Sequence, residues 1–216
     1  MDVRKAMLIA CMLQERLAPA FKRLEIAGSI RRGKQEVKDI ELVGLARFGP
    51  LQPDLFADSQ TSNQENLTNL EIPSLLEDSG WEIGDKDGPR FKQLVNAQHN
   101  INCDLFILHD PMEWGLGFLI RTGPAEFNIK LMSSIQRQDR HVTGNRLHGH
   151  PKGERKGKRV ECDKGDRCRL IIPTPSEEAV FEALGLPFLP PEERSEERLA
   201  AEIGHIGHRF YLPEVA

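Results

Sequence analysis

The stretch Gly28-Ser-Ile-Arg-Arg-Gly-Lys-Gln-Glu-Val-Lys-Asp39-Ile-Glu41-Leu-Val43 joins a small cationic turn to an apolar run that carries two acids. In a β-strand alternate side chains share a face, so Asp39 and Glu41 project together while Ile40 points into a core. Two like charges this close repel each other, and a divalent cation that takes carboxylate oxygens removes the conflict. The stretch therefore predicts a metal-binding strand.

The turn before this strand has the features of an anion site. Its glycines allow backbone N–H groups to approach a phosphate, Ser29 adds a hydroxyl donor, and Arg32 adds a bidentate fork. An anion site beside a cation site suits metal-assisted transfer from a nucleoside triphosphate. Taken separately, the turn and the two acids are each weak evidence for such a site, because an Asp-x-Glu pattern on a strand more often lies on a solvent-exposed face.

The combination resembles the DNA polymerase β (family X) branch of the nucleotidyltransferase superfamily. The signature of that family is Gly-Ser-(Phe)-Arg-Arg-Gly, a short spacer, and Asp-x-Asp on a strand. This chain has Gly28-Ser-Ile-Arg-Arg-Gly33 followed by Asp39-Ile40-Glu41, so that Glu replaces the second Asp.

The next part of the resemblance is Ile101–Leu108, an apolar run with the single acid Asp104. By itself this acid would be interpreted as a capping or edge residue. After Asp-x-Glu it matches the family's third catalytic carboxylate, on a neighbouring strand. Asn102 stands where the family commonly has Arg, and Cys103 is expected to face the core.

Residues 115–132 resemble the family's Tyr-Phe-Thr-Gly-Ser turn and the following Phe-Asn pair on a helix, which contacts the incoming nucleotide. Gly123 and Asn128 are retained, whereas Ile120 and Arg121 replace the aromatic pair. Residues 173–194 resemble the family's C-terminal element, with a helix capped by Ser176 or Thr174 and ended by Gly185.

Residues 146–169 are rich in Lys and Arg, and we interpret them as a mobile basic β-hairpin near template or primer phosphates. The candidates for nucleic-acid binding are Lys156, Lys158 and Arg159. Zinc binding is an alternative function of the same segment, although the spacings match no standard finger. Its candidate ligands are His148, His150, Cys162 and Cys168.

The remaining elements are read from periodicity and turn residues. We expect helices at 2–23 and 67–79, strands at 24–27 and 38–45, an exposed loop at 49–66, and a strand pair at 81–95 that turns at Asp87-Gly88.

Composition agrees with a globular protein, since 39% of the 216 residues are hydrophobic and 29% are charged. A net charge of −4 argues mildly against strong nonspecific DNA binding. The sequence contains no apolar run of membrane-spanning length, no signal-peptide pattern and no Gly-x-x-x-x-Gly-Lys-Ser/Thr loop. The four cysteines are scattered, which favours a reducing, cytoplasmic compartment.

The resemblance implies an α+β fold without lyase or helix-hairpin-helix domains. Residues 1–110 would form a mixed-sheet nucleotidyltransferase palm, and residues 111–216 a small α+β subdomain that contacts nucleotide and DNA. The implied activity is template-directed DNA polymerisation in repair or replication, by a monomer that acts on dNTP and primer-template DNA with two Mg²⁺ or Mn²⁺ ions and has no membrane partner. The implied site residues are Asp39, Glu41 and Asp104 as catalytic metal ligands, and Gly28, Ser29, Arg32, Gly123 and Asn128 as nucleotide ligands.

Two alternatives stay open. One is a template-independent nucleotidyltransferase that modifies RNA, a protein or a small molecule. The other is a nucleic-acid-binding module that has lost catalysis, against which the three retained acids argue.

Overall fold

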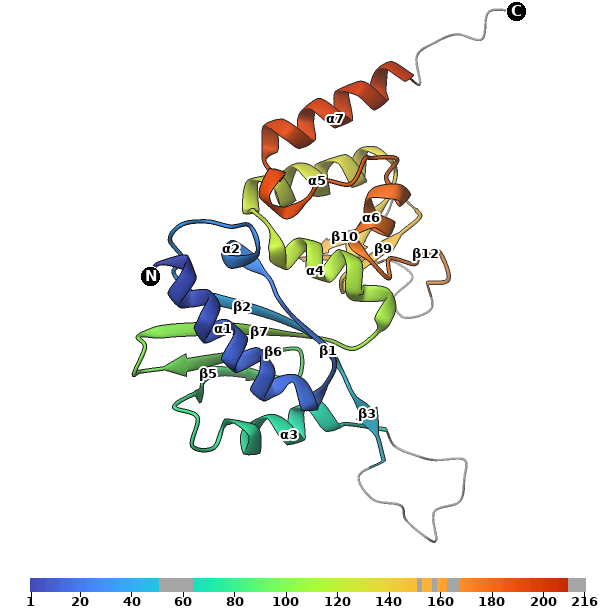
Figure 1. Cartoon of the computed structure of the whole chain (residues 1–216). Coiled ribbons are helices and arrows are strands. Elements are labelled where there is room, and N and C mark those ends of the chain that lie inside the picture. The colour runs from blue at the N-terminus through green and yellow to red at the C-terminus, as the bar shows by residue number, and fades with distance from the viewer. Residues whose placement is uncertain (51–63, 151–152, 157–158, 163–167, 210–216) are drawn as a thin grey trace, which may run out of the picture. The chain divides into compact units, whose positions relative to one another are not determined.

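The computed structural model describes residues 1–50, 64–150, 153–156, 159–162 and 168–209 (Figure 1). The chain divides into two compact units, Met1–Asp110 and Pro111–Ala216, called unit 1 and unit 2 below. Each unit has its own hydrophobic core. No helix in the described part of the chain is both long and apolar enough to cross a membrane.

Unit 1 is built on a five-stranded mixed sheet with the strand order β1-β2-β7-β6-β5. Strands β2 and β7 are parallel, and the other neighbours in the sheet are antiparallel. This arrangement confirms the expected α+β class with a mixed sheet. The elements are α1 (Val3–Leu17), a 3-10 turn (Ala18–Ala20), β1 (Phe21–Ile26), α2 (Gly28–Arg31), β2 (Ile40–Ala46), β3 (Phe48–Gly49), β4 (Glu65–Asn66), α3 (Leu67–Leu76), β5 (Glu82–Gly88), β6 (Phe91–Asn96) and β7 (Ile101–Leu108).

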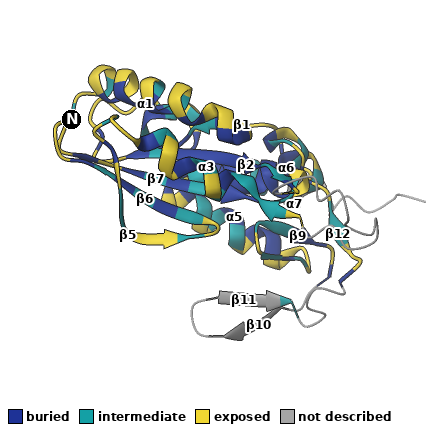
Figure 2. Ribbon diagram, turned by 90° about the horizontal axis from the view of Figure 1, so that it is seen from below, coloured by how far each residue is buried: buried dark blue, intermediate teal, exposed yellow. Residues whose placement is uncertain are grey.

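Helix α1 packs on one face of this sheet. Its buried residues belong to the same core cluster as alternate residues of the central strands β2 and β7. Figure 2 shows these strands as largely buried and α1 as buried on one side only. The helix contributes Ala6, Ile9, Ala10, Leu13 and Leu17, and the strands contribute Ile40, Leu42, Cys103, Leu105 and Ile107.

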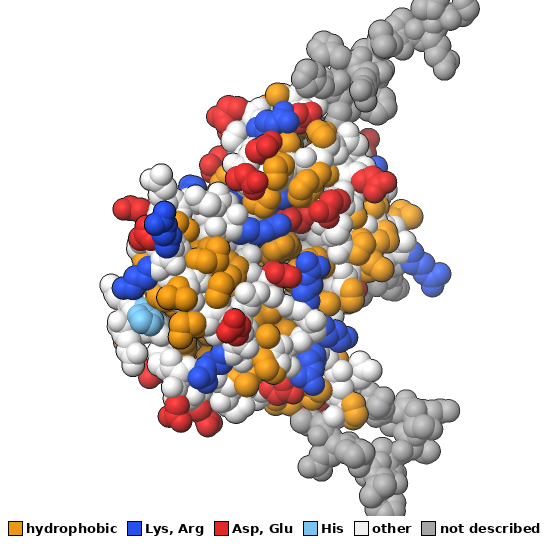
Figure 3. Space-filling view, in the orientation of Figure 1, with side chains coloured by type: hydrophobic (Ala, Val, Ile, Leu, Met, Phe, Trp, Pro, Cys, Tyr) orange, Lys and Arg blue, Asp and Glu red, His pale blue; other side chains and the backbone are white. Residues whose placement is uncertain are grey.

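The helix expected at 2–23 is too long. It ends at Leu17, because Pro19 occupies a following 3-10 turn, and β1 then begins at Phe21, earlier than the expected strand at 24–27. Helix α1 carries apolar residues outside the face that packs on the core. Three of them, Met7, Leu8 and Met12, are 38%, 63% and 62% exposed, and orange side chains gather over this part of unit 1 in Figure 3.

The other boundaries in unit 1 differ by a few residues from the expected ones. Strand β2 begins at Ile40, so Asp39 directly precedes it. Strand β5 runs through Gly88, which moves the reversal from Asp87-Gly88 to the residues just before Phe91. Most of the expected loop at 49–66 lies outside the described residues, but its two ends pair as β3 and β4.

Unit 2 combines a helical core with two small sheets. The elements are a 3-10 turn (Pro111–Glu113), α4 (Trp114–Thr122), α5 (Ala125–Arg137), β8 (His141–Thr143), β9 (Arg146–His148), β10 (Gly153–Lys156), β11 (Arg159–Cys162), β12 (Ile171–Ile172), α6 (Glu177–Ala183), a second 3-10 turn (Pro191–Glu193) and α7 (Glu196–Arg209). One sheet has the order β12-β9-β8, and the other is the β10–β11 hairpin.

Helices α4 and α6 meet at a close backbone approach. The Gly115 N–H donates to the Thr174 carbonyl at 2.7 Å, and a Cβ at this glycine would lie 2.0 Å from the carbonyl oxygen of Ser176. Of the two candidate caps for α6, Ser176 is the one used, since its side chain accepts from the Ala179 N–H. The helix is followed by Gly185 at a φ of 68°, as predicted.

The core of unit 2 contains a buried ion pair. The Arg194 side chain donates from Nη1 to Glu177 Oε1 at 2.8 Å and from Nε to the Leu189 carbonyl at 3.0 Å. Its guanidinium also lies 5.7 Å from the Phe181 ring and 6.0 Å from the Phe127 ring. A buried charge of this kind is tolerated because a carboxylate, a carbonyl and aromatic faces surround it.

Glu177→Ala should destabilise unit 2 by about 3–5 kcal/mol, because it leaves the Arg194 charge buried without its carboxylate. Urea unfolding measured by circular dichroism gives the free energy of unfolding. Glu178→Ala is the matched control, since Glu178 occupies the same first turn of α6 but is exposed. Equal effects of the two substitutions would contradict a special role for the buried pair.

Candidate active site

Two of the three predicted carboxylates come together on the central strands of unit 1, and the third lies just before one of these strands. Strands β2 and β7 pair in parallel with Glu41 opposite Asp104 and Ile40 opposite Cys103. Side chains directly across a strand pair share a face, so Glu41 and Asp104 lie side by side on the face opposite the α1 core. Asp39 is exposed and directly precedes β2, so it lies outside the strand on which the sequence analysis placed it, but its charge is close enough to act on the buried Cys103 thiol.

The buried thiol of Cys103 is influenced by all three acids. Burial raises its pKa well above the ordinary value, and the negative charges of Asp104, Glu41 and Asp39 raise the pKa further. The thiol is therefore protonated at neutral pH and packs as a small core residue, as the sequence predicted. The same electrostatic pattern indicates a concentration of negative charge that favours a bound cation.

The Gly28 turn lies directly against this acidic group. Gly28 has a φ of 62°, and a Cβ there would come within 1.5 Å of Glu41 Oε2. The Ala27 N–H also donates to the Glu41 backbone carbonyl at 2.8 Å. Only glycine leaves room for the Glu41 carboxylate in this position, so the turn and the acids form one site.

Ser29 carries a buried polar atom suited to a ligand. Its Oγ is buried and has no hydrogen-bond partner within the described parts of the protein. A buried hydroxyl without a partner is unfavourable, and a phosphate oxygen would satisfy it. Arg32 is half-buried at the end of α2, close in sequence to this hydroxyl.

The donor set fits Mg²⁺ or Mn²⁺. These are hard cations that prefer carboxylate and phosphate oxygens, and the site offers three carboxylates beside an anion-binding turn. The turn glycine that a Cβ would fill and the orphaned Ser29 hydroxyl are the structural features that support this assignment.

Gly123 and Asn128 belong to unit 2, where they join α4 to α5. Gly123 follows α4 at a φ of 69°, and its N–H donates to the Leu119 carbonyl at 3.0 Å. Asn128 Nδ2 donates to the Ile120 carbonyl at 2.7 Å, while its Oδ1 is buried without a partner in the described residues. Asn128 therefore ties the two helices together, and its contact with a nucleotide stays a prediction.

The basic hairpin expected near residues 146–169 has strands β10 and β11, with Lys156 paired to Arg159. Lys158 lies outside the described residues. The DNA contacts of these residues stay predictions.

The histidines and cysteines of the same region form a second cluster. His148, His150 and Cys168 are buried and Cys162 is half-buried. Burial and the nearby imidazoles of His141 and His150 lower the pKa of His148 to about 4, so its ring is neutral at neutral pH.

The cluster includes His141, which the sequence analysis missed. The sequence contained a signal for this placement, because Gly144-Asn145 is a dipeptide typical of two-residue hairpin turns. In the structure both residues have positive φ values, 56° and 61°. That turn pairs Thr143 with Arg146 and places His141 opposite His148.

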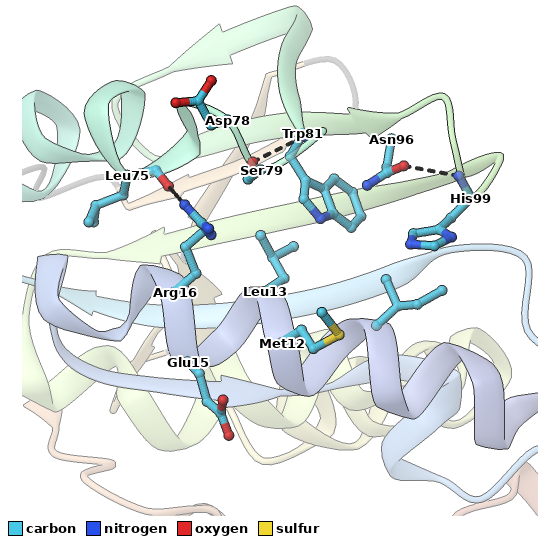
Figure 4. A pocket seen from close by; sticks show the side chains of 11 residues that line it. Met12, Leu13, Glu15, Arg16, Leu75, Asp78, Ser79, Trp81, Asn96 and His99 are labelled. Carbon is cyan, nitrogen blue, oxygen red and sulfur yellow. Dashed lines mark hydrogen bonds between the residues drawn. The ribbon is translucent and has the colours of Figure 1, made fainter.

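A hollow of about 630 Å³ lies elsewhere in unit 1, beside α1 and α3 (Figure 4). It is lined by residues such as Leu13, Arg16 and Trp81, and by none of the predicted site residues. Arg16 donates to the Leu75 carbonyl at 3.0 Å, which gives that charge a structural partner. The hollow is therefore separate from the carboxylate site.

Comparison with known proteins supports the fold. A family model described as DNA polymerase beta thumb matches residues 117–195. Crystal structures of Leishmania infantum polymerase beta are similar, both covering 90% of this chain: a ternary gap complex (18% identity, TM-score 0.66, 70% of that chain covered) and a ternary P/T complex (19%, 0.63, 76%). No curated protein sequence matches the chain.

The paired carboxylates, the glycine-serine turn against them and the thumb match point to the same fold. The chain therefore has the fold of polymerase beta, and residues 117–195 match the family model of a polymerase beta thumb.

Proposed function

We propose that the chain is a template-directed DNA polymerase that transfers a nucleotidyl group from a dNTP to a primer 3′-hydroxyl in repair or replication. The observation that carries the proposal is the in-register pair of Glu41 and Asp104, with Asp39 just before β2 and the Gly28 turn against the Glu41 carboxylate. Unit 1 would be the catalytic palm, and unit 2 would contact nucleotide and DNA.

Each site residue has a role that follows from its chemistry. Asp39, Glu41 and Asp104 would hold two Mg²⁺ or Mn²⁺ ions, which neutralise phosphate charge and make the 3′-hydroxyl more acidic. The Ser29 hydroxyl and the Arg32 guanidinium donate to the triphosphate oxygens. The Asp104 carboxylate would accept the proton of the primer hydroxyl, so that the 3′-oxygen attacks the α-phosphorus of the dNTP and the bond to the β-phosphate breaks with release of pyrophosphate.

The comparisons support DNA as the partner. The similar structures are ternary complexes of a polymerase beta, and the matched family model is described as a DNA polymerase beta thumb. In this proposal Gly123 and Asn128 approach the sugar and base, and the basic hairpin approaches the phosphates of primer-template DNA.

Asp104→Asn should reduce nucleotide transfer by about 10³-fold or more, because the amide neither accepts the proton nor supplies a negative charge to a cation. Primer extension with dNTP, run with and without a template strand, is the assay. Asp85→Asn is the matched control, since Asp85 is an exposed acid on β5 of the same sheet.

Extension by the unsubstituted protein that ignores the template would contradict the proposal and favour the template-independent reaction. Turnover of Asp104→Asn close to that of the control would remove Asp104 from the site.

Gly28→Ala should weaken Mn²⁺ binding by about 10-fold or more, since the new methyl group displaces the Glu41 carboxylate. Gly33→Ala is the matched control: Gly33 also has a positive φ, 69°, but a Cβ there meets nothing within 4 Å. Both substitutions carry similar backbone strain, so the difference isolates the contact with Glu41. Electron paramagnetic resonance of free Mn²⁺ measures the affinity, and equal loss in both variants would contradict this packing argument.

Replacing Lys156 and Arg159 by Ala should weaken primer-template binding and flatten its salt dependence by about 0.9 in log–log slope for each lost phosphate contact. Fluorescence anisotropy with labelled duplex at several salt concentrations measures the slope. Replacing Arg4 and Lys5, which are exposed on α1, changes the net charge equally and serves as the control. A slope that both double variants leave unchanged would place the hairpin away from DNA.

A further inference from the structure

We propose that unit 2 binds one zinc ion through His148, His150, Cys162 and Cys168. These residues lie at the ends of strands that are distant in sequence. His148 ends β9 and His150 follows it, Cys162 ends β11, and Cys168 precedes β12. The site is separate from the carboxylates of unit 1 and does not depend on the proposed polymerase activity.

The contacts between the four residues form a continuous chain. Cys168 Sγ lies 3.3 Å from His148 Nδ1 and 3.2 Å from His150 Nε2. Cys162 Sγ lies 3.5 Å from His150 Nε2. With Zn–S near 2.3 Å and Zn–N near 2.0–2.1 Å, sulfur and nitrogen ligands of a tetrahedral zinc are about 3.6 Å apart. These three separations therefore come within a few tenths of an ångström of the ligand spacing.

Hydrogen bonding alone explains this cluster poorly. Cys168 Sγ faces two imidazole nitrogens, and a thiol has one proton and is a weak donor. A zinc ion would take the lone pairs of His148 Nδ1 and His150 Nε2 together with the two sulfur atoms, and His148 Nε2 would then carry the ring proton.

The charge balance and the donor types favour zinc. Two thiolates and one Zn²⁺ have no net charge, so the centre can be buried at low cost in electrostatic free energy. Thiolate and neutral imidazole are the usual donors of structural zinc sites, whereas Mg²⁺ and Mn²⁺ prefer oxygen. Four protein ligands would close the coordination shell, which is typical of a structural centre.

His141 is assigned as a positioning residue. Its Nδ1 lies 2.9 Å from the His150 carbonyl oxygen, and its ring stacks on His148 with centroids 4.5 Å apart. It thereby fixes both histidine ligands from β8. Its candidate ligand atom also lies within 4.8 Å of those of His148, His150 and Cys162, so the experiment must separate its role from theirs.

The ion would connect the two small sheets of unit 2. It would connect the end of the β10–β11 hairpin to the β12-β9-β8 sheet on both sides of residues 163–167. The buried residues of the main core in unit 2 include Leu147 from this sheet but none of the cluster ligands. Bound zinc would therefore hold the hairpin and the sheet together where the cluster ligands add nothing to the hydrophobic core.

The first experiment is metal analysis of the full chain, stripped with chelator and then titrated with Zn²⁺. We expect one tightly bound zinc per chain, and a Co²⁺ form with thiolate-to-metal charge-transfer absorption. Cys162→Ser and Cys168→Ser should lose the ion or that absorption. Cys11→Ser and His99→Gln are the controls, since Cys11 lies on α1 and His99 is exposed in unit 1. Failure of the unsubstituted chain to bind Zn²⁺, or retention of the ion in both cysteine variants, would overturn the proposal.

The second experiment needs no substitution and covers the case of variants that fail to fold. Zinc should protect Cys162 and Cys168 from alkylation, measured by peptide mass spectrometry, while Cys11 reacts equally with and without the ion. His141→Gln should retain the ion with weaker affinity, whereas His148→Gln should lose it. Equal alkylation of Cys162 and Cys168 in both states would overturn the site, and loss of the ion in His141→Gln alone would overturn the assignment of His148 as a ligand.

Discussion

The parallel pairing of β2 with β7 is the constraint on which the rest of unit 1 depends. It places Glu41 directly beside Asp104, an arrangement that two negative charges would oppose in isolation. The opposite face of the same strands offsets this cost, because Ile40, Leu42 and Cys103 are fully buried against the α1 core. The hydrophobic face of the sheet thus holds the acidic face in a geometry that a cation can use.

The glycine-serine turn is coupled to these acids through space. Gly28 leaves room for the Glu41 carboxylate, and the adjacent Ser29 hydroxyl is buried without a partner in the described residues. Negative charge for a cation and a donor for an anion consequently lie on neighbouring elements of one compact unit. Pre-organised charge of this kind is what phosphoryl and nucleotidyl transfer require of a protein.

Unit 2 keeps polar groups in its interior by two different means. Arg194 is neutralised by Glu177 and surrounded by phenylalanine rings within the helical core. The histidines and cysteines near β9 and β11 gather where the small sheets have few apolar residues to bury. Both arrangements connect segments that are distant in sequence, and both depend on polar atoms finding partners inside the unit.

The sequence by itself determined the features that depend on local geometry. The extent of β7 and the end of α6 at Gly185 follow from residues close together in the chain, whereas the choice of Ser176 over Thr174 as the cap of α6 came from the structure. The tertiary structure alone decided that Glu41 pairs with Asp104 and that His141 lies near Cys162. It also decided which side of α1 is buried, a side that leaves Leu8 exposed. These features depend on which surfaces pack together, and periodicity along one segment carries no information about its partner.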